Sequence, residues 1–377
     1  MIQRPNWLHK VHDAWSRRSV VWLSGVRGAG KTTLARMVPG IHHFNCDLPS
    51  TRRGIEDDPR AFFGGLAEDA LVAIDEIDRL DDPGRVLSVA VQQYPDLRLM
   101  AASSSMPRDA DTLPDALAGR MAELHLPPVS WQECVGTFGI EDLDRRLLGG
   151  GLPGPLLDPE RDPGFFSEWI ETFYARDVVA LFNTRNRRGF LALFQELLGD
   201  SGGQLDFGRL AGISGQSRPT VNVHLESLRC LHAIHLVRPF HGEGNREIVS
   251  RPKCYAFDTG FVAFERGWRD SDRGRLWEHL VLDALRSRFP EEDILYWRDK
   301  SGRELDFVVR RETGAVDLVE CEVVDPYALD PEPVALFRSR YAAGGNYIVT
   351  PVESGPYRIR HGSLTFTVCA TSYLDSI

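Results

Sequence analysis

Residues 25–32 read Gly25-Val26-Arg27-Gly28-Ala29-Gly30-Lys31-Thr32 and are followed by Thr33. The spacing G-x-x-x-x-G-K-[ST] is typical of a loop whose backbone N–H groups surround phosphate oxygens and whose lysine reaches the outer phosphates. Residues 20–23 form an apolar run typical of a buried strand, and residues 33–37 have helix-forming character before a Pro-Gly stop. A strand, a glycine-rich loop and a helix N-terminus together direct N–H groups at an anion. This stretch predicts a nucleotide-binding domain.

Lysine is rare in the chain, and its rarity adds weight to position 31. The 377 residues contain four lysines, Lys10, Lys31, Lys253 and Lys300. One of them stands where a phosphate loop needs a compact ammonium group.

Composition narrows the class of protein. A length of 377 residues favours two or three domains, and 42% hydrophobic with 26% charged residues is typical of a globular protein. The six cysteines form no C-x-x-C pair, and no apolar run reaches the roughly 18–20 residues of a membrane span. We therefore expect a cytoplasmic protein without a membrane anchor. The net charge of −10 argues against coating nucleic acid by bulk electrostatics.

Two carboxylates follow a second apolar run, residues 71–74. In a P-loop ATPase the first, Asp75, holds Mg²⁺ together with Thr32, and the second, Glu76, activates the attacking water as general base. The alternative is that one of these carboxylates caps the next helix. After a complete phosphate loop, the pattern predicts ATP and Mg²⁺ as ligands.

Two further polar positions are candidates for the same site. Residues 97–102 form an apolar run that ends in Ser103 and Ser104, either of which is placed to contact the γ-phosphate or the attacking water, unless the segment is a plain serine-rich loop. Arg120 is a candidate for an arginine finger that neutralises phosphoryl charge in the site of a neighbouring copy. The alternative for Arg120 is an arginine used only for solubility or for an ion pair.

The order of the elements predicts an α/β fold in three segments. Residues 1–160 alternate strand-like and helical stretches, as in a parallel sheet flanked by helices, with a small lid. Residues 165–262 begin with helical patterns, and residues 263–377 form another α/β pattern, with a helix at 276–289 and strands at 294–297, 305–309, 316–324 and 346–350. A Gly/Pro-rich stretch, residues 147–155, marks the end of the first segment.

Taken together, these motifs resemble the prokaryotic AAA-type ATPases that are fused to a C-terminal region of unknown function. The resemblance covers nearly the whole chain and rests on residues 25–32, 74–76, 103–105, 117–120, 149–153, 174–177, 253–260, 277–278 and 296–300. It implies an AAA-like core, a winged helix and a terminal domain similar to restriction endonucleases.

The predicted winged helix lies within residues 205–257. Residues 205–211 form a short helix candidate, residues 212–215 a turn, and Ser217 a cap for a second helix. Strand-like residues 233–237 and 253–257 would form the wing. In the second helix, Arg218, Asn222 and His224 are candidates to face outward toward DNA, with Glu226 opposing phosphate. Packing or protein contacts are the alternative use of such a module, because its basic residues are few.

The resemblance to restriction endonucleases assigns a degenerate site to the last segment. Glu278 on a helix, Asp306 on a strand and Glu320 in Glu320-Cys321-Glu322 occur in the order of a metal-dependent nuclease. Period-two alternation predicts Glu320 and Glu322 on one strand face. Glu322 stands where a lysine belongs, and Lys300 is the alternative source of an ammonium. We expect a fold retained for structure, regulation or docking.

The sequence as a whole predicts an Mg²⁺-dependent ATPase that drives conformational change or assembly of its C-terminal modules and that can act as a homo-oligomer. Two alternatives stay open at this point. One is a nucleotide switch or scaffold with little turnover, and the other is an ATP-driven DNA nuclease.

Overall fold

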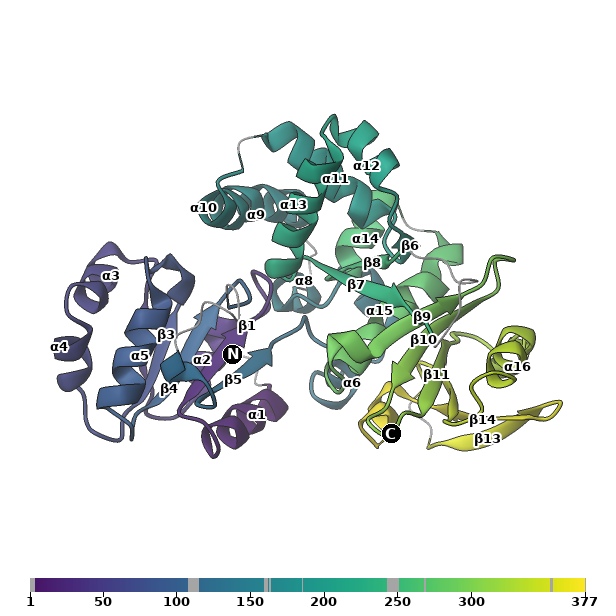
Figure 1. Ribbon diagram of the computed structural model, residues 1–377, viewed down its shortest axis with the longest axis horizontal. Coiled ribbons are helices and arrows are strands. Elements are labelled where there is room, and N and C mark those ends of the chain that lie inside the picture. Colours follow the sequence, from purple (N-terminus) through teal and green to yellow (C-terminus); the bar gives the residue numbers. More distant parts are fainter. Residues whose placement is uncertain are drawn as a thin grey trace. The chain divides into compact units, whose positions relative to one another are not determined.

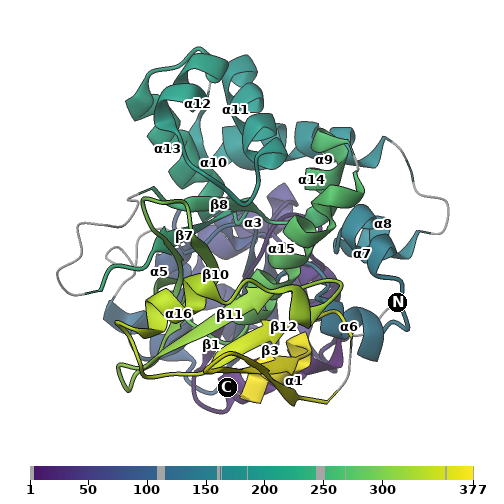
Figure 2. The same ribbon diagram turned by 90° about the vertical axis from the view of Figure 1, so that its right-hand side faces the viewer.

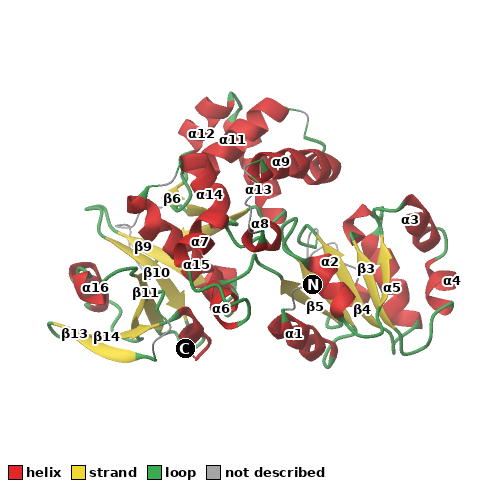
Figure 3. Ribbon diagram, turned by 180° about the vertical axis from the view of Figure 1, so that it is seen from behind, coloured by secondary structure: helices red, strands yellow, loops and turns green. Residues whose placement is uncertain are grey.

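The computed structural model describes residues 4–107, 115–158, 162, 164–184, 186–242, 251–267, 269–352 and 355–376. The chain forms two compact units. The first unit comprises residues 1–128, 152–154 and 230–233, and the second unit comprises residues 129–151, 155–229 and 234–377. Figure 1 colours them along the sequence, and Figure 3 separates helices from strands. No helix in the described ranges is long and apolar enough to cross a membrane.

The first unit is built on a parallel sheet with the strand order β2-β3-β4-β1-β5. The strands are β1 (Val20–Ser24), β2 (His42–Asn45), β3 (Leu71–Asp75), β4 (Arg98–Ser103) and β5 (Met121–His125). The apolar runs at residues 20–24, 71–74 and 97–102 are thus strands of one parallel sheet, as predicted, and the structure makes them neighbours. Because all strands run in one direction, their carboxyl ends meet at one edge, where the phosphate loop begins.

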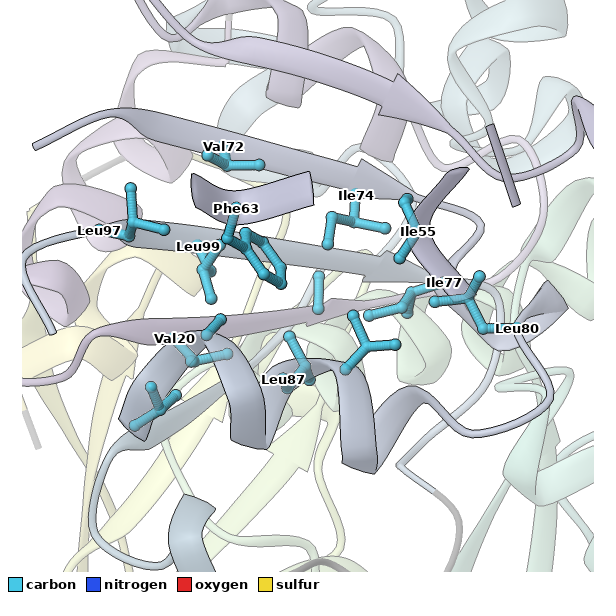
Figure 4. Close-up of a cluster of buried hydrophobic side chains, with 14 of the residues drawn as sticks. Val20, Ile55, Phe63, Val72, Ile74, Ile77, Leu80, Leu87, Leu97 and Leu99 are labelled. Atoms are coloured by element: carbon cyan, nitrogen blue, oxygen red, sulfur yellow. The ribbon is translucent and has the colours of Figure 1, made fainter. Parts of the chain in front are cut away.

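Helices cover both faces of this sheet, which explains why its three central strands, β3, β4 and β1, are mostly apolar. They are α1 (Pro5–Trp15), α2 (Lys31–Met37), α3 (Pro49–Glu56), α4 (Pro59–Gly64) and α5 (Pro83–Gln93). Val20 and Trp22 pack on the side of α3, α4 and α5, the cluster shown in Figure 4. Val21 and Leu23 pack on the side of α1 and α2. The alternation follows from the period-two geometry of a strand.

Local chemistry sets where two of these helices begin. Asp58 and Asp82 each precede a proline, and each side chain accepts a backbone hydrogen bond, from Ala61 N (3.0 Å) and Arg85 N (2.8 Å) respectively. A capping carboxylate and a proline at the first helical position both favour helix initiation.

The second unit begins with helices around an aromatic core. They are α6 (Trp131–Gly136), α7 (Leu143–Gly149), α8 (Pro153–Leu157, which starts in the first unit), α9 (Phe165–Phe173), α10 (Val179–Phe182), α11 (Arg187–Gly199), α12 (Phe207–Ser214), α13 (Arg218–Cys230) and α14 (Thr259–Arg266). A π-helical turn, Tyr174–Val178, joins α9 to α10. Trp169 stacks on Phe173 and Phe257, with ring centroids 4.9 Å apart in both pairs. Through these rings, α9 packs against the segment that leads into α14.

The second unit also contains a mixed sheet with the order β13-β14-β12-β11-β10-β9-β7-β8-β6, seen in Figure 2. Its strands are β6 (Gly203–Gln204), β7 (Ile234–Pro239), β8 (Lys253–Ala256), β9 (Ile294–Arg298), β10 (Glu304–Arg310), β11 (Val316–Cys321), β12 (Asn346–Val349), β13 (Tyr357–His361) and β14 (Leu364–Cys369). Helix α16 (Glu332–Arg338) packs on one face through Val334 and Phe337. Helix α15 (Arg273–Arg286) is tied to β12 by a hydrogen bond from Trp277 Nε1 to Val349 O (2.9 Å).

Two details differ from the sequence-based expectations. Helix α12 continues to Ser214, so the predicted turn at residues 212–215 reduces to a short connection around Gly215, which has a φ of +63°. Strand β11 ends at Cys321 rather than at residue 324, and the Glu322 carboxylate accepts hydrogen bonds from Val323 N and Val324 N (3.0 and 3.1 Å). Glu322 N still donates to Val349 O of β12 (3.0 Å), and a shared strand face of Glu320 and Glu322 stays a prediction.

The two predicted wing strands, β7 and β8, pair antiparallel. The loop residues 243–250 between them lie outside the described residues. β7 also pairs in parallel with β9, so one sheet continues across the predicted boundary at residues 262–263.

Candidate functional site

The phosphate loop connects β1 to α2 and is shaped by glycine. Gly30, directly before α2, has a φ of +103°, which glycine adopts without the penalty that a side chain carries. At Gly25 the constraint is a close approach, since a Cβ atom there would lie 2.4 Å from the backbone oxygen of Leu126. The glycines that define the motif are therefore required by the local backbone.

Lys31 is held inside this loop. Its side chain is buried, and Nζ donates hydrogen bonds to Gly25 O (2.7 Å), Val26 O (3.2 Å) and Ser104 Oγ (3.3 Å). These three acceptors are neutral oxygens, and they orient the ammonium group.

Thr32 and Asp75 meet although 43 residues separate them in sequence. Thr32 Oγ1 donates a hydrogen bond to Asp75 Oδ2 (2.6 Å). His43 Nε2, from the neighbouring strand β2, lies 3.3 Å from the same oxygen. The other carboxylate oxygen of Asp75, Oδ1, is buried and has no hydrogen-bond partner among the described residues. A hydroxyl and a carboxylate with an available buried oxygen are ligand types that suit Mg²⁺, so the residues present fit that ion.

Glu76 follows Asp75 in a strained backbone conformation. Its φ is +53°, which side-chain-bearing residues rarely adopt and which concentrates at functional sites. Burial raises the pKa of Glu76 to about 7, with Asp78 adding to the rise, while Lys31 and Arg27 act to lower it. The carboxyl group therefore lies close enough to the loop to experience the charge of Lys31.

The serines at the end of β4 point in different directions. Ser103 Oγ lies 3.1 Å from Ser105 Oγ and accepts a hydrogen bond from Ser105 N (3.0 Å). Ser104, one residue further, contacts Lys31 instead. Side-chain alternation at the strand end explains the difference. Of the two candidates from the sequence, the structure brings Ser104 to the lysine, whereas Ser103 faces Ser105.

Arg120 lies at the other end of the same sheet, where the strands begin. It directly precedes β5, in which Met121 pairs with Val20 at the start of β1, whereas the phosphate loop follows the end of β1. The five residues of β1 separate these two ends of the sheet by about 16 Å. Arg120 Nη1 donates to Val91 O (3.1 Å), and the residue is exposed. Arg120 therefore does not join the loop of its own chain.

The C-terminal carboxylates do come together, around a lysine that the sequence reasoning missed. Lys253 Nζ lies 3.0 Å from Glu278 Oε1 and 2.5 Å from Glu304 Oε1. Asp306 and Glu320 are close enough for the charge of Lys253 to act on both. Lys300, the alternative considered from the sequence, is exposed. The available signal was a lone lysine at the start of an otherwise uncharged strand.

The outward face of α13 differs from the prediction at one position. Arg218 and Asn222 are exposed as expected. His224 is buried, with its ring 5.3 Å from that of Phe190, and burial lowers its pKa. The expectation that His224 faces outward was wrong, because it lies on the same helix face as Val221 and Leu228, which are also buried. Glu226 is exposed and paired with Arg229 (3.0 Å), which further reduces the positive charge of this face.

Three family models match successive stretches of the chain. Residues 17–135 match the AAA domain family. Residues 140–272 and 273–359 match two domains of unknown function, DUF8612 and DUF4143. The predicted similarity to AAA-type ATPases is thus confirmed for the part of the chain that contains the phosphate loop, Asp75 and Glu76.

Individual proteins and one solved structure also resemble this chain. Uncharacterized proteins of Mycobacterium bovis and Mycobacterium tuberculosis are each 28% identical over 323 residues, covering 82% of this chain and 71% of the relative. Among solved structures, a Walker-type ATPase of Pyrococcus abyssi matches with a TM-score of 0.49 at 15% identity, covering 71% of this chain and 96% of that chain.

Proposed function

We propose that the first unit binds ATP together with Mg²⁺ and hydrolyses it. The observation that carries this proposal is the convergence of Lys31, Thr32 and Asp75 at the carboxyl edge of the parallel sheet, with Thr32 and Asp75 joined at 2.6 Å. The match of residues 17–135 to the AAA domain family supports it.

Each residue has a distinct task in this proposal. The backbone N–H groups of the loop and the start of α2 bind phosphate oxygens, and Lys31 places its ammonium at the outer phosphates. Thr32 Oγ1 and Asp75 would hold Mg²⁺, which when bound offsets the negative charge of the triphosphate. Glu76 accepts a proton from the attacking water. Ser104 holds Lys31 in position through its 3.3 Å contact.

Arg120 completes the proposal as a residue that acts between copies of the chain. Because Arg120 lies at the opposite end of the sheet from the phosphate loop of its own chain, we assign it to the site of a neighbouring copy. An arginine supplied by a neighbour would neutralise charge on the transferred phosphoryl group and would link hydrolysis to assembly.

A DNA-binding role receives less support. The exposed face of α13 offers Arg218 and Asn222 beside the Glu226–Arg229 pair, whereas DNA-binding helices usually present clustered basic residues. The proposal is therefore ATP hydrolysis that moves or assembles the second unit, without a nucleic-acid step.

Steady-state phosphate release from ATP and Mg²⁺ tests this function. We expect turnover in the wild type and a loss of at least about a hundredfold in Lys31→Ala and Glu76→Gln. Lys300→Ala is the matched control, because it removes an exposed lysine outside the first unit. Glu76→Gln should still bind ATP, and Lys31→Ala should not. Wild-type turnover no faster than that of both variants would refute hydrolysis, and retained ATP binding would then favour a nucleotide switch.

A further inference from the structure

Lys253 occupies an unusual position for the most strongly hydrated cationic side chain. It lies on β8 with its side chain only 4% exposed, between Glu278 of α15 (3.0 Å) and Glu304 of β10 (2.5 Å). The ring of Tyr296 lies 5.4 Å from Nζ, within the range of a cation–π contact. A buried ammonium group is stable only when its charge is paired and its protons are donated.

The surrounding groups form what we term the Lys253 cluster: Lys253, Tyr255, Glu278, Glu304, Asp306 and Glu320. The Tyr255 hydroxyl donates to the same Glu278 oxygen that Lys253 contacts. Cys321 N donates to Asp306 Oδ2 (2.9 Å). Glu320 is only 6% exposed, and its Oε1 has no hydrogen-bond partner among the described residues. Four carboxyl groups thus gather around one ammonium.

Four carboxyl groups from three elements, α15, β10 and β11, would ordinarily suit a hard divalent cation. The position of Lys253 opposes that use, because its ammonium already lies against two of the four. Among the described residues, no group of three or more His, Cys, Asp or Glu side chains is arranged to hold a metal ion. The metal implied by the resemblance to nucleases therefore does not fit the cluster as it stands.

We propose that Lys253 is a tethered cation that fills a carboxylate-lined divalent-cation site in the second unit. The ammonium occupies the position that Mg²⁺ or Mn²⁺ would take, and the site binds no metal while Lys253 is present. The second unit then has no metal-dependent cleavage activity. This assigns Lys253 a role different from that of a lysine that activates water beside a bound metal.

Electrostatics agree with this geometry. Burial acts to lower the pKa of Lys253, but the carboxylates of Glu278 and Glu304 outweigh it and hold the pKa well above the ordinary value. The ammonium therefore stays charged at neutral pH.

Mn²⁺ binding without nucleotide tests the proposal, read by electron paramagnetic resonance of free Mn²⁺ and by thermal unfolding. The wild type should have no Mn²⁺ site that depends on Asp306. Any Mn²⁺ that it binds should bind equally well to Asp306→Asn. Lys253→Ala should bind Mn²⁺ at least about a hundredfold more tightly, because a like charge in direct contact has been removed. The gain should disappear in Lys253→Ala/Asp306→Asn. Lys300→Ala, an exposed lysine, is the control and should behave as the wild type.

Two further variants keep the test decisive if Lys253→Ala folds poorly. Lys253→Arg retains the positive charge and should fold without any response to Mn²⁺, whereas refolding of Lys253→Ala should improve when Mn²⁺ is present. Wild-type Mn²⁺ binding that depends on Asp306 would overturn the proposal, since metal and lysine would then coexist. A Lys253→Ala variant that neither binds Mn²⁺ nor refolds better with it would also overturn it. Neither result bears on ATP hydrolysis in the first unit.

Discussion

Replacing Ser104 with alanine tests which serine at the end of β4 serves the phosphate site. Ser104 Oγ accepts a hydrogen bond from Lys31 Nζ at 3.3 Å, whereas Ser103 Oγ interacts with Ser105. Both side chains are buried, with 2% exposure for Ser104 and 0% for Ser103. Ser104→Ala and Ser103→Ala therefore remove the same atom at the same depth, and only one of the two changes touches the lysine.

The contact between Ser104 and Lys31 sets the size of the effect. A hydrogen bond to a charged group contributes about 1.5–3 kcal/mol. The 3.3 Å length and the two remaining acceptors of Lys31, Gly25 O and Val26 O, favour the lower end of that range. A loss of about 1.4 kcal/mol is a factor of about ten. We expect kcat/KM for ATP to fall about tenfold in Ser104→Ala and by less than about threefold in Ser103→Ala.

The assay is steady-state phosphate release over a range of ATP concentrations at saturating Mg²⁺, with thermal unfolding of each variant as the measure of folding. Both variants should unfold within a few degrees of the wild type. A larger loss in Ser103→Ala than in Ser104→Ala would refute the reasoning and restore Ser103 as the site residue. Unchanged kinetics in Ser104→Ala would show that the contact with Lys31 has no role in turnover.

Three further predictions concern other parts of the chain. Arg120→Ala should have low ATPase activity that recovers when it is mixed with Glu76→Gln, whose intact Arg120 completes a neighbour's site; no recovery in the mixture would exclude action between copies. Gly25→Ala should lose binding of a fluorescent ATP analogue, because its Cβ would lie 2.4 Å from Leu126 O, whereas Gly54→Ala on α3, with nothing within 4 Å, should retain it. His279→Gln should reduce the acid sensitivity of folding. Burial lowers the pKa of His279 from 6.5 to about 3, so the unfolded chain takes up a proton first as the pH falls. The stability lost between pH 7 and pH 5 should shrink by about 2 kcal/mol in denaturant titrations; an unchanged pH dependence would contradict this.

The first unit was predictable because its signals are local. Strand, loop and helix around Lys31 are contiguous in sequence, and Asp75 and Glu76 follow an apolar run of strand length. Parallel strands then bring Thr32 and Asp75 together without further information. The choice between Ser103 and Ser104 was beyond the sequence, because it depends on the rotational phase of β4 relative to the loop. The burial of His224 depends on the phase of α13 in the same way, where a shift of one position exchanges an inward for an outward residue.

The two buried lysines show why the second site was harder to predict. Lys31 lies within six residues of the two carbonyl oxygens that hold it, so a motif of eight residues identifies it. Lys253 meets Glu278 and Glu304 from separate elements, 25 residues or more away in sequence. Their contacts also point to opposite uses. Lys31 donates hydrogen bonds to carbonyl oxygens of its own phosphate loop, whereas carboxylates surround Lys253 and offset its charge within the fold. A lysine oriented by the loop that would bind phosphate is suited to an anionic ligand, and a lysine enclosed by carboxylates already takes the place of a cation.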